Sequence, residues 1–180
     1  RSIRLIQDVY RGTKTLGVVS QKDGQIEEPN AEDLNRVGTI ATIIRMLRMP
    51  DGSTTAIIQG KKRFEILKMA KTDPYFTASV KEFAELRPEK TDKNFDALIS
   101  SLKDMATEII KQSPHIPTEA QFALKNIDSP SFLVNFISSN MNATVEDKQK
   151  MLEVADLRER ANFLLAHLTK ELQMLQMKNE

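Results

Sequence analysis

Few side chains in this sequence have the types and spacing that enzyme or metal chemistry requires. There are no cysteines, which excludes disulfides, thiolate metal sites and a cysteine nucleophile together. The two histidines, His115 and His167, stand 52 positions apart without clustered carboxylates. A metal site or a histidine-based triad needs several such groups at short range. We therefore predict no metal site, and structural or surface roles for both histidines.

The motifs for nucleotide and serine chemistry are also missing. A phosphate-binding loop requires G-x-x-x-x-G-K-[ST]. The nearest segment, Gly60-Lys61-Lys62, has neither the upstream glycine nor the Ser or Thr that would bind magnesium. No G-x-S-x-G motif occurs, and no serine stands in a glycine-rich context that would present it as a nucleophile. The sequence predicts no catalytic site and no cofactor in these residues.

Composition and charge restrict the class of protein further. The chain is 40% hydrophobic and 28% charged, as in folded globular proteins, and carries a net charge of +1. Residues 1–84 contain 14 basic and 10 acidic residues, a net +4, and residues 85–180 contain 12 and 15, a net −3. Neither value resembles a nucleic-acid-binding stripe. No apolar run reaches the roughly 18 residues that cross a bilayer, so we predict a cytoplasmic protein. The start at Arg1 rather than Met suggests a fragment.

The first half of the sequence has the pattern of a short helix followed by β-strands. Segments rich in Ile, Val, Thr and Phe alternate with turn residues. The segment Met49-Pro50-Asp51-Gly52-Ser53 predicts a hairpin turn, because proline presets one turn dihedral and glycine accepts a positive φ. Short strands with short connections favour a small barrel or sandwich. The predicted helix spans 2–10, and the predicted strands span 16–20, 37–47, 53–59, 63–69 and 76–83.

The second half has helical spacing of its apolar residues. We predict helices that begin near Asn94, at Thr118, after Ser129-Pro130 and after Thr144, and a long last helix over 156–178. The charged, proline-interrupted stretch 85–92 predicts a linker. The sequence thus predicts an α+β protein with a β-rich subdomain at 1–84 and a helical subdomain at 93–180.

The last helix carries leucines at heptad-like spacing. Leu168, Leu172 and Leu175 are separated by four and three positions. Such a seam packs either on its own bundle or against a helix of a second subunit, and one heptad series does not identify its partner. The three leucines are therefore our candidates for contacts between subunits, with packing inside the chain as the alternative.

Three motifs in a fixed order carry a family resemblance. Val37-Gly38-Thr39 is followed by Leu47-Arg48-Met49-Pro50-Asp51-Gly52, and then by a strand that ends in Gly60 and Lys61. This order resembles the N-terminal domain of Lon-type ATP-dependent proteases. The segments 126–130 and 146–153, each near the start of a predicted helix, are similar to the helical part of the same region. The resemblance covers nearly the whole chain.

The resemblance implies a PUA-like β-barrel subdomain, a helical subdomain and a long helix that leads to an AAA+ ATPase and a Ser-Lys peptidase. In the family a strand region precedes the helix that begins here at Ser2, so we expect a barrel without it. The family forms hexamers, and ATP and magnesium would be bound by domains outside this chain. The implied role is substrate recognition and assembly in a protease that degrades misfolded and regulatory proteins, with no catalytic site in these residues.

A recognition domain for unfolded chains needs exposed apolar surface that tolerates many sequences, and methionine suits this because its side chain is flexible and polarizable. Met46, Met49 and Pro50, beside the predicted turn, are our candidates for substrate contact, together with Lys61 and Lys62. The alternative is that Met46 packs in the sheet, Met49 covers the hairpin, and the lysines are only solvated charges.

Two other functions compete with this interpretation. The first is a stand-alone binding module with a Lon-like N-terminal domain that belongs to no protease. The second is RNA binding, since PUA-like barrels can bind RNA. The weak positive charge, two tyrosines and absence of tryptophan argue against RNA, because little is left for phosphate contacts or base stacking.

Overall fold

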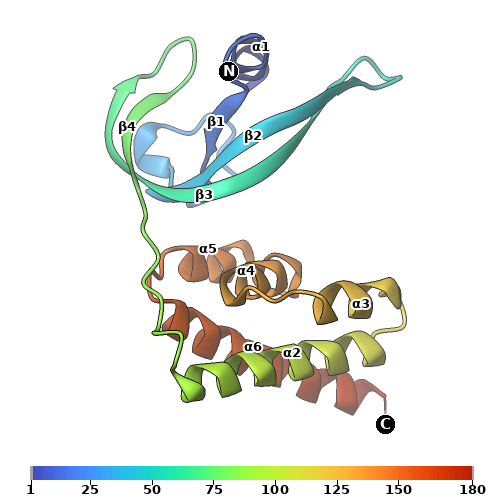
Figure 1. Cartoon of the computed structure of the whole chain (residues 1–180). Helices are drawn as coiled ribbons and strands as arrows, with labels where there is room; N and C mark the ends of the chain where they lie inside the picture. The colour runs from blue at the N-terminus through green and yellow to red at the C-terminus, as the bar shows by residue number, and fades with distance from the viewer. Residues whose placement is uncertain (1, 180) are drawn as a thin grey trace. The chain divides into compact units, whose positions relative to one another are not determined.

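The chain folds into two units, which we describe separately. A computed structural model describes residues 2–179. Its internal contacts divide the chain into Arg1–Ala84 and Glu85–Glu180. The first unit contains the sheet, and the second contains the long C-terminal helix (Figure 1). The predicted α+β class is confirmed.

The first unit is a helix followed by a curled antiparallel sheet (Figure 1). The strand order is β1-β2-β3-β4, so every strand pairs with its neighbour in sequence and β1 and β4 are the two edges. The sheet curls like part of a barrel but stays open between these edges within the described residues. The elements are α1 (Ser2–Arg11), β1 (Thr15–Val18), a 3-10 turn (Ala31–Asp33), β2 (Val37–Arg48), β3 (Thr54–Lys71) and β4 (Thr77–Glu82).

Strand β3 differs from the sequence prediction. The segments 53–59 and 63–69 were expected as separate strands, but the structure joins them into one strand from Thr54 to Lys71. The strand continues through Gly60-Lys61-Lys62 because β2 pairs with it on both sides of this segment, Thr42 with Gln59 and Thr39 with Arg63. A register shift beside Ile40 accommodates the extra residue. The local composition of Gly60-Lys61-Lys62 predicted a break between two strands, but pairing with the long strand β2 keeps β3 continuous.

The second unit is a bundle of helices whose first turns are capped largely as the sequence indicates. The side chains of Asp92, Ser129, Thr144 and Asp156 each accept a hydrogen bond from a backbone N–H group in the first turn that follows. Thr118 precedes a helix without such a bond. The helices are α2 (Lys93–Gln112), α3 (Glu119–Lys125), α4 (Pro130–Asn140), α5 (Val145–Leu152) and α6 (Leu157–Lys178).

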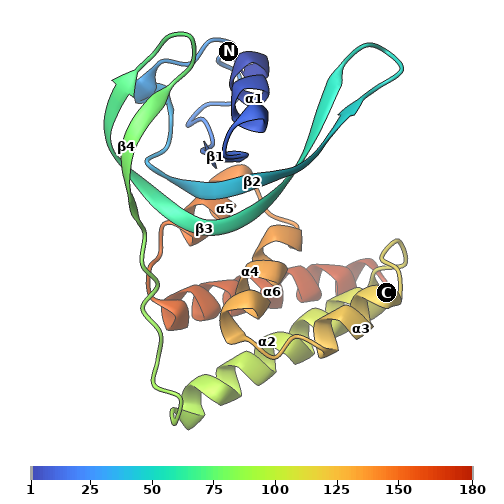
Figure 2. The ribbon, with the colours of Figure 1, turned by 45° about the horizontal axis from the view of Figure 1, so that its top comes forward.

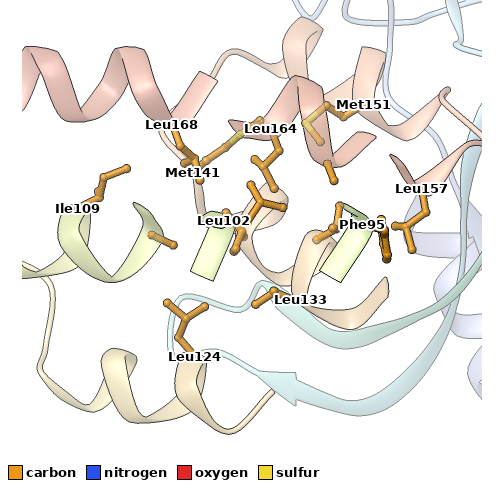
Figure 3. Packing of buried hydrophobic residues seen from close by; sticks show 14 residues of the cluster. Phe95, Leu102, Ile109, Leu124, Leu133, Met141, Met151, Leu157, Leu164 and Leu168 are labelled. Atoms are coloured by element: carbon orange, nitrogen blue, oxygen red, sulfur yellow. The ribbon is translucent and has the colours of Figure 1, made fainter. Parts of the chain in front are cut away.

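One apolar cluster holds this bundle together, and all five helices contribute to it. Figure 3 shows Leu102, Leu124, Leu133, Met151 and Leu164 converging, one residue from each helix. Burial of such side chains is the main favourable term in folding, about 1.5–3 kcal/mol for each fully buried large apolar residue.

The stretch 85–92, expected as a linker, is attached to the helices. The backbone of Leu86 forms hydrogen bonds with the first residue of α6 and with the segment just before that helix: Leu86 N–H donates to the Ala155 carbonyl at 2.9 Å, and Leu157 N–H donates to the Leu86 carbonyl at 2.8 Å. Asp92 caps α2. The helical unit therefore includes this segment.

A buried arginine joins four parts of the helical unit. The guanidinium of Arg160, on α6, donates to the Met151 carbonyl at 3.2 Å, to Asn135 Oδ1 at 2.6 Å and to Glu85 Oε1 at 3.3 Å. The same Glu85 carboxylate accepts hydrogen bonds from Ser131 and from Arg87. Because its charge is paired and its donors are used, Arg160 can be almost fully buried.

A second partly buried carboxylate, that of Glu171, is less well paired than that of Glu85. Glu171, on α6, accepts a hydrogen bond from the Asn142 backbone, and one turn earlier His167 Nε2 lies 3.0 Å from the Asn142 carbonyl oxygen. Burial raises the pKa of Glu171, which the charge of His167 and the Asn142 bond only partly offset. Its Oε2 atom is buried and has no hydrogen-bond partner among residues 2–179.

Replacing Glu171 with glutamine should therefore flatten the pH dependence of stability. The folded-state pKa of Glu171 is raised, so its contribution to stability is fully present below the ordinary value of 4.5 and is lost as the pH rises through the folded pKa. Urea unfolding monitored by circular dichroism between pH 4 and 8 should show less loss of stability on the alkaline side for Glu171→Gln. An equal loss in both proteins would contradict this assignment.

Candidate functional site

The longest surface feature of the first unit is the hairpin formed by β2 and β3. β1 pairs with β2 only at residues 39–42, and β4 pairs with β3 only from Phe64 onward. Beyond these limits the hairpin has just two strands and projects from the sheet (Figure 2). We call residues 44–62 the arm; its base, residues 59–62, pairs with the part of β2 that also pairs with β1.

The turn at the tip of the arm confirms the sequence prediction. Arg48 pairs with Thr54, and Gly52 has a φ of 88°, the positive value that glycine adopts without a steric cost. Asp51 Oδ1 accepts hydrogen bonds from the Ser53 backbone at 2.9 Å and from its hydroxyl at 2.6 Å. These two bonds from Ser53 lower the pKa of Asp51. The tip is thus a defined turn with a charged carboxylate.

The arm exposes apolar side chains because two strands cannot cover both of their own faces. Ile44 is 55% exposed, and Ile57 and Ile58 are each 44% exposed. Met49 is exposed near the tip. Isolated exposed apolar residues are ordinary, whereas several on one projecting hairpin make it a candidate contact surface.

The structure separates the five predicted contact residues into two groups. Met46 pairs with Ala56 and is half-buried, whereas Met49 and Pro50 are exposed at the tip. Lys61 and Lys62 are exposed at the base of the arm, roughly 25 Å along the strand at about 3.3 Å per residue. Lys61 and Lys62 therefore lie at the opposite end of the arm from Met49 and Pro50.

Sequence reasoning missed the three isoleucines of the arm as contact candidates. Their signal was two pairs of adjacent apolar residues, Ile43-Ile44 and Ile57-Ile58, on neighbouring strands. Adjacent strand residues point to opposite faces, so a pair shows that both faces carry apolar groups. A register shift at Ile44 further changes which side chain faces out: Ile43 is buried and Ile44 is exposed.

The first unit also contains an apolar cavity of about 420 Å³. Leu5 and Val9 of α1 line it, together with both edge strands of the sheet. Phe64 and Ile66 contribute from β3. The Tyr75 hydroxyl donates to Asp8 Oδ2 at 3.1 Å, which ties α1 to the loop before β4. This cavity could not be predicted from the residue pattern, because it depends on how far the sheet curls.

The predicted contact leucines of the last helix lie against their own bundle. Leu168 is only 2% exposed, and Leu172 and Leu175 are partly buried against the same apolar cluster. This packing corresponds to the alternative that the heptad spacing left open. A second chain could reach Leu168 only if the bundle opened, while Met174 and Met177 are exposed near the end of the helix.

Within residues 2–179 no three His, Cys, Asp or Glu side chains cluster as metal ligands. In the same part of the chain, no helix is both long and apolar enough to cross a bilayer.

Comparison with known families finds one whose model matches most of the chain. The model of the ATP-dependent protease La (LON) substrate-binding domain matches residues 1–170. The chain belongs to this family. The Lon family resemblance read from the sequence motifs is thereby confirmed.

Relatives and solved structures extend the match. The chain is 51% identical over 180 residues to a Lon protease of Flavobacterium johnsoniae and 46% identical to one of Cytophaga hutchinsonii. Each of these two alignments covers all of this chain but only 22% of the relative. The N-terminal domain of a Mycobacterium avium complex Lon protease has the same fold, with a TM-score of 0.65 and 20% identity over 86% of this chain and 90% of that one.

Proposed function

We propose that this Lon-family domain recognises unfolded polypeptide through the arm. The observation that carries the proposal is a projecting two-stranded hairpin with exposed isoleucines and methionine and with basic residues at its base. Membership of a substrate-binding domain family supports the same role. No nucleotide, metal or catalytic group is needed for such binding.

The physical properties of the arm fit a partner without fixed structure. Apolar association is not directional, and its strength follows the area removed from water, so many sequences can satisfy it. Met46 and Met49 are flexible and adjust to different partner shapes. Weak, sequence-tolerant binding is the expected result.

We further propose that the domain serves a larger protein, since the chain spans about a fifth of the length of its relatives. That protein would be a cytoplasmic, hexameric ATP-dependent serine protease that degrades misfolded and regulatory proteins, with ATP and magnesium bound outside this chain. Reading the gene beyond Glu180 tests this. A Walker A motif within about the next hundred residues supports it, whereas an early stop codon leaves a separate binding module.

Removing apolar groups from the arm should weaken binding of an unfolded protein. We expect Ile57→Thr/Ile58→Thr to lower the affinity about tenfold, because partial burial of these side chains contributes about 1.4 kcal/mol in total. Threonine keeps the branched shape that suits a strand. The measurement is fluorescence anisotropy with a labelled, permanently unfolded protein, without ATP.

Leu67→Thr is the matched control, since Leu67 is also an exposed apolar residue of β3 but lies outside the arm. Its affinity should equal that of the unchanged protein. Chemical-shift mapping by NMR adds a position-resolved measurement. Perturbations confined to residues 85–180 would reject the arm as the contact surface.

A further inference from the structure

One side of the arm ends in an open strand edge. The inner side of β3 pairs with β2 along the whole arm. The outer side of β3 pairs with β4 only from Phe64 onward. The last hydrogen bond on this side joins Phe83 N–H to the Arg63 carbonyl at 3.1 Å. Within the described part of the chain, no strand pairs with the outer edge of residues 54–62. A strand edge presents a row of backbone donors and acceptors to a partner.

This edge lies beside apolar side chains on both faces of the strand. Ile57 and Ile58 are adjacent, so they point to opposite faces, and both are exposed. A strand added along the edge would place its own alternating side chains next to them. Cross-strand pairs of this kind contribute to sheet stability.

The charge of the arm favours one kind of partner. Residues 44–62 contain four basic residues, Arg45, Arg48, Lys61 and Lys62, and a single acidic residue, Asp51. Asp51 accepts its hydrogen bonds from Ser53 inside the turn. Lys61 and Lys62 stand at the base of the free edge, so a strand lying along it would end beside two cations.

We propose that an unfolded substrate adds to this edge as an extra β-strand, with an apolar segment along Ile57 and Ile58 and acidic residues beside Lys61 and Lys62. The inference rests on the proposed function and specifies the substrate: an extended, apolar polypeptide segment with an acidic flank. Main-chain hydrogen bonds provide affinity for any sequence, and the flanking charge provides selectivity. Substrates are thus distinguished by the charge beside their apolar segments.

N-methylated peptides test the main-chain pairing without altering the protein. The probe is a synthetic peptide as long as the free edge, with alternating Val and Thr and two Glu residues at one end. The comparison peptide has the same side chains, but the backbone amides along both of its edges are N-methylated. Edge pairing predicts that methylation weakens binding to the full 180-residue chain more than tenfold, since each lost hydrogen bond contributes about 0.5–1.5 kcal/mol.

The outcomes separate this inference from the proposed function. Equal or tighter binding of the methylated peptide overturns edge pairing but leaves apolar capture by the arm in place, because methylation adds apolar surface. If neither peptide nor the unfolded protein binds, both proposals fail. A loss of binding only for the methylated peptide supports edge pairing.

The flanking charge is tested with the same measurement. A peptide with two Lys in place of Glu should bind about tenfold more weakly at low salt, and the difference should shrink at high salt as charges are screened. Lys61→Gln/Lys62→Gln should abolish the preference while leaving binding of an uncharged peptide unchanged. A preference that survives this double substitution overturns the assigned position of the acidic flank.

Discussion

Replacing Arg160 with methionine is expected to lower the free energy of unfolding of the helical unit by about 3 kcal/mol. Methionine keeps an apolar stem of similar length but removes the donors to the Met151 carbonyl, Asn135 and Glu85. The three acceptor oxygens then lose these hydrogen bonds while they remain partly shielded from water. The measurement is urea unfolding followed by circular dichroism at 222 nm, which reports mainly on α2–α6.

Arg87→Met is the matched control, because Arg87 contacts the same carboxylate from the surface. The side chain of Arg160 is 3% exposed and that of Arg87 is 69% exposed. An exposed ion pair contributes about 0–1 kcal/mol. If the two substitutions destabilise the protein equally, burial is not the reason for the importance of Arg160.

The Glu85 carboxylate also makes the effect of Arg160→Met on stability depend on pH. Burial alone would raise the pKa of Glu85, but the hydrogen bonds from Ser131 and Arg87 and the charges of Arg87 and Arg160 outweigh it and hold the pKa below its usual 4.5. A lowered folded-state pKa contributes stability that is present above pH 4.5 and lost as the pH falls through the folded pKa. Arg160→Met should reduce this acid-dependent loss.

Gly38→Ala should destabilise the first unit by about 3 kcal/mol, at the upper end of the cost of overpacking. A Cβ atom at Gly38 would lie 2.2 Å from the Val18 carbonyl oxygen and 2.5 Å from Val19 Cγ1. The carbonyl belongs to the neighbouring strand β1, so it can move only if β1 shifts away from β2. Strand pairing, rather than a flexible side chain, would have to yield.

Tyrosine fluorescence measures this effect separately, because the two tyrosines of the sequence, Tyr10 and Tyr75, both lie in the first unit. Gly24→Ala is the control, since a Cβ atom there would have no neighbour within 4 Å. The tyrosine transition should shift to lower urea for Gly38→Ala alone. A stable Gly38→Ala protein would show that β1 tolerates displacement from β2.

The helices and the turn were largely predictable from local sequence because their signals are local. A cap needs a Ser, Thr or Asp followed by a few helical residues, and the turn needs a glycine at the position with a positive φ. Asp156 and Gly52 satisfy these conditions without help from distant residues. The order of three short motifs was enough to indicate the Lon family.

The partners of long-range contacts could not be predicted. Arg160 reads as one more surface charge on a helix, and only the fold brings Glu85, which is 75 positions earlier, to its guanidinium. The continuity of β3 through Gly60 likewise depends on pairing with β2. The apolar cavity depends on the curl of the sheet, which no local pattern of residues predicts.

By itself, the sequence determined the class of fold, the helix boundaries, the hairpin turn and the absence of known catalytic motifs, because each depends on residues close together in the chain. The tertiary structure decided that Leu168 faces its own bundle and that Lys61 lies far from Met49. It also decided that one edge of the arm has no strand partner within residues 2–179. These features depend on where neighbouring strands and helices end, which residues far apart in the chain determine together.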